Sequence, residues 1–234
     1  MQVTMAVAKV PKFGLTESGD SVELVERPRG GVTGILVDGQ SHGPAAKRLS
    51  QLVVAKAMQL VVDGVRDGAV ARGVHDYLHA VRGGKVSAEL VLLSADIHTR
   101  TLVVTRNTHV PVLIRRGDGS ILRLDEPVEP IGTLEILRPV IAEVPLEEGL
   151  VALAFTDGVL AAGRRNGREW PVERLEELLR SADPDDMQAL ADRVLAEAMA
   201  LDEGRPADDM AVLVAGVREE GGDRIRRMNL TMKW

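Results

Sequence analysis

The spacing of apolar residues predicts ten strands and four helices along the chain. Alternating or continuous apolar runs predict strands over residues 1–10, 21–26, 32–37, 86–95, 101–106, 110–116, 121–124, 137–144, 150–156 and 210–217. Apolar residues at helical spacing predict helices over residues 45–65, 69–81, 172–181 and 185–201. For the last helix we expect Asp183 to cap the N-terminus and Pro184 to occupy the first turn.

The order of these elements favours an α+β fold. Strands mostly follow strands through short turns such as 27–31 and 117–119, so the sheets should be largely antiparallel. A regular alternation of strand and helix is missing, which argues against a doubly wound parallel sheet. The two helix pairs are therefore expected to lie outside centrally placed sheets.

Composition and charge narrow the function classes. The chain has 234 residues, which is enough for one domain with a sizeable core. Cysteine is absent, so disulfides and thiolate sites are impossible, and a reducing cytoplasm is the expected location. The net charge of −6 argues against nucleic-acid binding. Without a signal peptide or an apolar run of about 18 residues, we expect no membrane association.

Acidic residues adjoin three of the predicted apolar strands. Asp38 and Asp157 each follow a strand and precede glycine, and Asp208 precedes the last strand. A single Asp-Gly pair is often only a turn, but a buried strand that ends in an acid is costly unless the acid is paired or liganded. If the last strand is antiparallel to the other two, the three acids should meet on one edge of the sheet. The first hairpin should place Asp20 beside Asp38.

Four converging carboxylates with no lysine or arginine neighbour would repel one another. Hard divalent cations with oxygen ligands would relieve this repulsion, and the absence of a histidine cluster argues against zinc. We therefore expect Asp20, Asp38, Asp157 and Asp208 to hold two Mn²⁺ or Mg²⁺ ions. Two such ions can share a water, lower its pKa and aim it at phosphorus.

Three short motifs, in this order, resemble those of the type 2C metal-dependent protein phosphatases. The resemblance is greatest to the bacterial SpoIIE/RsbU/RsbX branch and runs from about position 16 to 216. The motifs are residues 38–43, 156–158 and 208–212, with 18–20 similar to the first acidic motif of the branch and 107–111 loosely similar to its central segment.

The resemblance implies a four-layer α-β-β-α sandwich with two mainly antiparallel sheets, formed by a single phosphatase domain over residues 1–217. It implies that phosphoserine or phosphothreonine on proteins is hydrolysed with two Mn²⁺ or Mg²⁺ ions. By position, Asp38 would bridge both ions, the Gly39 carbonyl would touch one, and Asp20, Asp157 and Asp208 would complete the set. Asp209 would take a lesser part, since neighbouring residues of a strand face opposite sides.

The chain departs from the family pattern at several positions. Gln40 and Ser41 replace a methionine and a glycine of the motif at residues 38–43, and Ala211 replaces a threonine or serine of the motif at residues 208–212. No arginine matches the phosphate-binding position of the eukaryotic enzymes. No sensor, coiled-coil or membrane segment precedes the motifs, which favours a standalone RsbX-type enzyme. By analogy, its substrate would be a phosphorylated anti-sigma antagonist or stressosome protein.

Two other functions would also place acids beside apolar strands or use the same fold. An aspartyl-phosphate (haloacid dehalogenase-like) phosphatase needs a second acid two residues after its nucleophile, and Gln40 and Val159 occupy those positions. That mechanism is therefore excluded at both sites. A degenerate phosphatase fold that only binds partner proteins stays open: the four retained acids argue against it, and Gln40 and Ser41 argue for it.

The remaining features favour structural roles. His75 and His79 have zinc-like spacing on a predicted helix but no third ligand, so a solvated or half-buried pair is expected. His42 could orient the metal loop, although capping of the turn before the helix is the favoured role, and His109 should be structural. Residues 218–234 form a C-terminal extension, for which alternation near the end predicts an extra strand in a sheet of this chain or of a partner subunit, with docking of a substrate protein as the alternative.

Overall fold

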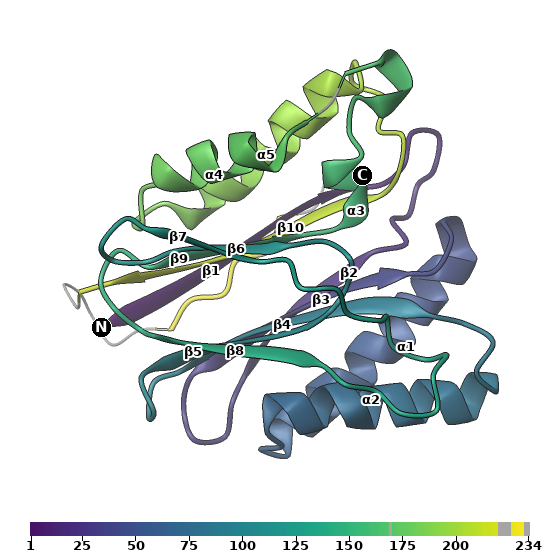
Figure 1. Ribbon diagram of the computed structural model, residues 1–234, viewed down its shortest axis with the longest axis horizontal. Helices are drawn as coiled ribbons and strands as arrows, with labels where there is room; N and C mark the ends of the chain where they lie inside the picture. The colour runs from purple at the N-terminus through teal and green to yellow at the C-terminus, as the bar shows by residue number, and fades with distance from the viewer. Residues whose placement is uncertain (169, 220–225, 232–234) are drawn as a thin grey trace.

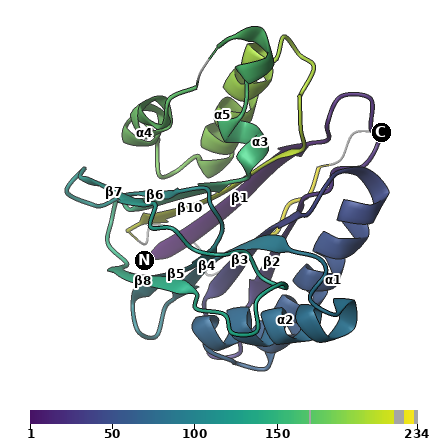
Figure 2. The same ribbon diagram turned by 45° about the vertical axis from the view of Figure 1, so that its right-hand side comes forward.

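Two five-stranded sheets lie face to face between two groups of helices in the computed structural model (Figures 1 and 2). The structure describes residues 1–168, 170–219 and 226–231. Every pair of neighbouring strands in both sheets is antiparallel. The predicted α-β-β-α sandwich is therefore confirmed.

The chain builds the two sheets from strands that are distant in sequence. The first sheet has the order β1-β10-β9-β6-β7, and the second has the order β2-β3-β4-β5-β8. The strands are β1 (Gln2–Val10), β2 (Ser21–Glu26), β3 (Val32–Gly39), β4 (Ala88–Asp96), β5 (Thr101–Asn107), β6 (Val112–Arg115), β7 (Ile121–Leu124), β8 (Val140–Pro145), β9 (Val151–Phe155) and β10 (Met210–Arg218). The helices are α1 (Gly43–Val62), α2 (Asp67–Arg82), α3 (Asp157–Leu160), a 3-10 turn η1 (Arg164–Asn166), α4 (Val172–Arg180) and α5 (Met187–Leu201).

Three layers of apolar side chains hold the sandwich together. The apolar stripes of α1 and α2 pack on the outer face of the second sheet, and α4 and α5 pack on the outer face of the first. The inner faces of the two sheets pack against each other through aliphatic side chains. A Cβ on Gly34 of β3 would lie 2.8 Å from the Leu213 side chain of β10, so glycine lets the sheets approach closely here.

The start of α5 differs from the prediction. Asp183 and Pro184 do not begin the helix, which starts at Met187 with Asp186 as its N-cap, and the Asp186 side chain accepts a hydrogen bond from the Ala189 amide at 3.0 Å. Asp183 instead accepts from the Asp185 amide at 3.0 Å and forms a turn ahead of the helix. Asp and Pro suit turns as well as helix starts, so the local pattern did not separate the two.

The two ends of the chain meet in one sheet. β1 pairs with β10 along its whole length, from Gln2 opposite Arg218 to Val10 opposite Met210. Residues 226–231 have no regular secondary structure, and Arg226 forms an ion pair with Glu26 at 2.6 Å. Part of the predicted extra strand falls on residues 232–234, outside the described residues, so that strand and the boundary at 217 stay predictions. No helix in the described part of the chain combines the length and apolarity needed to span a bilayer.

Candidate metal centre

The four predicted acids come from both sheets and meet at one end of the sandwich. Asp20 lies just before β2 and Asp38 lies near the end of β3, whereas Asp157 begins α3 after β9 and Asp208 lies just before β10. The expectation that one sheet edge would collect them is wrong, because β3 and the β9–β10 pair belong to different sheets. Face-to-face packing of the sheets brings their ends together instead.

These acids line a hollow of about 350 Å³, here called the acidic hollow. Its lining residues are Asp20, Asp38, Gln40, Ser41, His42, Ser87, Ala88, Glu89, His109, Pro130, Asp157, Asp208 and Asp209. The register Ser21 opposite Val37 brings Asp20 beside Asp38, as the hairpin predicted. A Cβ on Gly158 would collide with the Asp209 carbonyl oxygen, so glycine here lets α3 approach the segment before β10.

The electrostatics of the hollow are those of carboxylates held together without enough countercharge. Burial, followed by repulsion from Asp20, Asp157 and Glu89, raises the pKa of Asp38 to about 10. Burial also raises the pKa of Asp20 to about 7. For Asp157, burial and then Glu89 raise the pKa, while a hydrogen bond from the Asp38 carboxyl lowers it. In this state protons relieve part of the repulsion among the acids.

Thr156 connects Asp20 to the opposite sheet. Its hydroxyl donates to Asp20 Oδ2 at 2.8 Å and accepts from the Ala211 amide at 2.9 Å. This hydrogen bond lowers the pKa of Asp20, against the larger effect of burial. Because Thr156 is itself buried, it fixes both the orientation of Asp20 and the spacing between the two sheets at the site.

Asp208 and Asp209 both line the hollow, which corrects the expectation that only one of them could face it. Residues 207–208 form a bend, so the alternation of an extended strand does not apply to this pair. The Asp208 side chain is 47% exposed, and its Oδ1 lies 3.9 Å from Lys12 Nζ. Asp209 is 5% exposed and accepts from the Lys12 amide at 2.9 Å. The expectation that the acids have no lysine neighbour is therefore also wrong.

Glu89 is a further acid of the hollow that the sequence reasoning missed. It lies on β4 directly opposite Asp38 and accepts hydrogen bonds from the Thr108 hydroxyl and, at 3.2 Å, from the His109 amide. The buried Arg106 donates to the carbonyls of Thr108 and Val110 from the other side of this loop. A lone glutamate in the apolar run of β4 was the available signal, but only the strand register places it opposite Asp38.

The departures from the family motif have clear local consequences. The Gln40 backbone N–H donates to the Ser87 carbonyl at 3.3 Å, and the Gln40 side-chain Oε1 accepts from the Ser87 backbone N–H at 3.0 Å. Ser41 has φ = +78°, a left-handed conformation that favours glycine. His42 is the N-cap of α1, but its side chain makes no capping hydrogen bond. His42 and His109 both line the acidic hollow.

His75 and His79 bind the backbone of a neighbouring loop. His75 Nδ1 accepts from the Gly132 amide at 3.0 Å, and His79 Nδ1 lies 3.1 Å from the Gly132 carbonyl oxygen. His75 is 1% exposed, and burial lowers its pKa. The pair therefore attaches the segment around residue 132 to α2, as a structural role requires.

The donor set of the acidic hollow fits oxygen-preferring divalent cations. Among the described residues, no three acidic or histidine side chains already form a closed metal site. Cations such as Mg²⁺ keep several waters and bind through one or two protein carboxylates, so an open group of aspartates suits them. Positive charge would also replace the protons that now relieve the repulsion at Asp20, Asp38 and Asp157.

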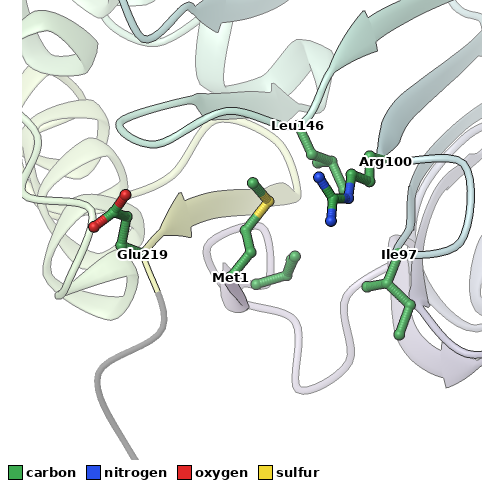
Figure 3. A pocket seen from close by; sticks show the side chains of 6 residues that line it. Met1, Ile97, Arg100, Leu146 and Glu219 are labelled. Carbon is green, nitrogen blue, oxygen red and sulfur yellow. The ribbon is translucent and has the colours of Figure 1, made fainter.

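A second hollow, of about 500 Å³, lies at the other end of the sandwich (Figure 3). Met1, Val3, Ile97, Arg100, Leu146 and Glu219 line it. Figure 3 shows Arg100 beside Leu146, with Glu219 set apart from both. This hollow brings together no group of acids comparable to the first one.

Comparisons with known proteins agree with the fold. The family model described as Stage II sporulation protein E (SpoIIE) matches residues 28–218. Stage II sporulation protein E of Priestia megaterium is 23% identical over 215 residues, and that of Bacillus subtilis (strain 168) is 22% identical over 218 residues. These alignments cover 91% and 92% of this chain but 36% and 26% of the relatives, so the chain spans about a third or less of their length.

Solved structures share the architecture. The phosphatase domain of SpoIIE from Bacillus subtilis, with a fragment of its regulatory domain, superposes with a TM-score of 0.80 at 20% identity, over 93% of this chain and 64% of that one. RsbX in complex with magnesium gives 0.68 at 13% identity, over 91% and 94%. A structure from work on the bacterial stressosome gives 0.68 at 21% identity, over 92% and 100%. The chain therefore belongs to the SpoIIE family of PP2C-type serine/threonine phosphatases.

Proposed function

We propose that residues 1–217 form a metal-dependent protein phosphatase domain that hydrolyses phosphoserine or phosphothreonine. The observation that carries this proposal is the convergence of Asp20, Asp38, Asp157 and Asp208 from two sheets into one hollow. Two Mn²⁺ or Mg²⁺ ions would be held there by these four carboxylates and the Gly39 carbonyl. When bound, the ions would lower the pKa of a water and orient it for in-line attack on phosphorus.

The surrounding residues position this set. Thr156 orients Asp20 through its hydroxyl. Glu89 anchors the loop that carries His109 at the edge of the hollow. Lys12 places a cation beside Asp208, where it can contact the phosphate of the substrate. It would thus take the place of the phosphate-binding arginine that the sequence lacks. Asp209 holds the Lys12 backbone in place and so supports that contact.

The proposed substrate is a phosphorylated regulatory protein. The resemblance to the RsbU and RsbX branch, and the similarity to a structure from work on the bacterial stressosome, favour an anti-sigma antagonist or a stressosome protein. Incubation with such phosphoproteins from the same genome, followed by mass spectrometry of the phosphosites, would identify the substrate. Unchanged phosphorylation of every candidate would remove this part of the proposal.

Turnover of p-nitrophenyl phosphate tests the catalytic part. We expect hydrolysis with Mn²⁺ or Mg²⁺, none with EDTA, and no covalent phospho-enzyme, because no side-chain nucleophile is proposed. Isothermal titration with Mn²⁺ provides a readout that is independent of activity. Strained Ser41 and the substitution at Gln40 favour the alternative, a non-catalytic binding module. Absence of both metal binding and turnover in the folded protein would select that alternative.

A further inference from the structure

A group of cations and one aromatic side chain adjoins the acidic hollow on the side of Asp208. We define the basic rim as Lys12, Phe13, Arg164, Arg165 and Arg205. Its members come from the β1–β2 connection, from η1 after α3 and from the segment before β10. Figures 1 and 2 show these three segments side by side at the same end of the sandwich.

Two hydrogen bonds and one cation–π contact tie the three segments of the rim together. The Phe13 amide donates to the Pro206 carbonyl at 2.9 Å, and the Arg205 guanidinium lies 5.5 Å from the centre of the Phe13 ring. Arg165 donates to the Ala207 carbonyl at 3.1 Å, next to Asp208. These contacts hold the three segments next to one another, and Lys12 Nζ lies 3.9 Å from Oδ1 of Asp208, which lines the hollow.

The rim combines free positive charge with exposed apolar surface. Phe13 is 62% exposed, and the three arginines are exposed as well. Arg168 and Glu203, which lie nearby, pair with each other at 3.6 Å. In the described part of the chain, no carboxylate lies within ion-pair distance of Arg164, Arg165 or Arg205. In a chain of net charge −6, three arginines beside an acidic site that have no ion-pair partner among the described residues form a local reversal of charge.

We infer that the basic rim binds an acidic stretch of the substrate protein that lies next to the phosphorylated residue. Arginine fits this task because its guanidinium can bind a carboxylate through two parallel hydrogen bonds. The exposed Phe13 ring would receive an apolar side chain of the same stretch. The rim thus adds a sequence preference to the catalytic site, and this inference rests on the phosphatase function proposed above.

Synthetic phosphoserine peptides with acidic, neutral or basic flanks test the rim. The measured quantity is kcat/KM of each peptide divided by kcat/KM of p-nitrophenyl phosphate. We expect this ratio to be about tenfold higher for the acidic peptide than for the basic peptide, and we expect the difference to shrink with added salt. Arg164→Glu/Arg205→Glu should abolish this preference, and Arg164→Gln/Arg205→Gln should weaken it. Arg72→Glu/Arg82→Glu, the same charge change at two exposed residues of α2 in the opposite outer layer, is the matched control and should leave the ratio unchanged.

A binding measurement separates failure of the rim from failure of the enzyme. Fluorescence anisotropy of the labelled acidic peptide in EDTA compares wild type with Arg164→Glu/Arg205→Glu, which share the same hollow. Weaker binding by the variant supports the rim even where no turnover is seen, and absence of turnover refutes only the proposed function. Equal binding by both proteins, or equal turnover of all peptides, would overturn the inference. Loss of preference in Arg72→Glu/Arg82→Glu would overturn it as well, because net charge alone would then explain the effect.

Discussion

Replacing Asp38 with asparagine should stabilise the metal-free protein while removing its response to divalent cations. Burial and the neighbouring carboxylates raise the pKa of Asp38 from 3.8 to about 10. Each unit between the unfolded pKa and pH 7 costs about 1.4 kcal/mol, so the penalty at pH 7 is at most about 4 kcal/mol. Because the neighbouring acids share that penalty, we expect a gain of about 1–3 kcal/mol. Asparagine can still donate to Asp157, as the protonated carboxyl of Asp38 does.

The sign of the pH dependence follows from the raised pKa. The folded carboxyl binds its proton more tightly than the unfolded one, so its contribution to stability is full below pH 4 and declines as pH rises toward 10. The advantage of Asp38→Asn in EDTA should therefore be small at pH 5 and larger at pH 8. Urea unfolding at both values measures it, and Asp192→Asn, an exposed acid on α5, is the control. A variant less stable than wild type at pH 8, or stabilised equally by Mn²⁺, would refute the reasoning.

Substitutions at Ser41, at the Asp208–Asp209 pair and at Thr156 provide further tests of the site. Ser41→Gly should relieve the left-handed backbone and raise the free energy of unfolding by up to about 1 kcal/mol in urea, whereas an unchanged or lower value would show that Ser41 is unstrained. Asp209→Ala should lower the free energy of unfolding by about 1–3 kcal/mol, because the Lys12 amide loses its acceptor. Asp208→Ala should lower stability less and kcat/KM more, and a larger loss of kcat/KM in Asp209→Ala would reverse their roles. Thr156→Val removes the hydrogen bond to Asp20, so it should raise the pKa of Asp20 and weaken Mn²⁺ binding about 10–100-fold in titration calorimetry. Thr156→Ser keeps the hydroxyl and should retain binding. Equal Mn²⁺ affinity of the Val and Ser variants would contradict the orienting role of the hydroxyl.

Local patterns predicted much of this fold, because apolar residues recur at the period of the helix or strand whose face is buried. The β2–β3, β4–β5 and β6–β7 hairpins lie where apolar runs flank short turns, and their strands pair as expected. The same patterns marked Asp38, Asp157 and Asp208, since an acid beside an apolar strand is visible without any tertiary structure. The hairpin register was enough to place Asp20 beside Asp38, because a short turn fixes the pairing of its strands.

Long-range packing decided the rest. Nothing near β1 indicates that it pairs with β10, about 200 residues away, or that β3 and β9 lie in different sheets. That arrangement sets Glu89 opposite Asp38 and buries Asp209, neither of which periodicity could reveal. The sequence by itself determined which residues are apolar enough to be buried and which acids adjoin them. Only the tertiary structure decided which acids face one another, because strand pairing between distant segments depends on the packing of the whole core.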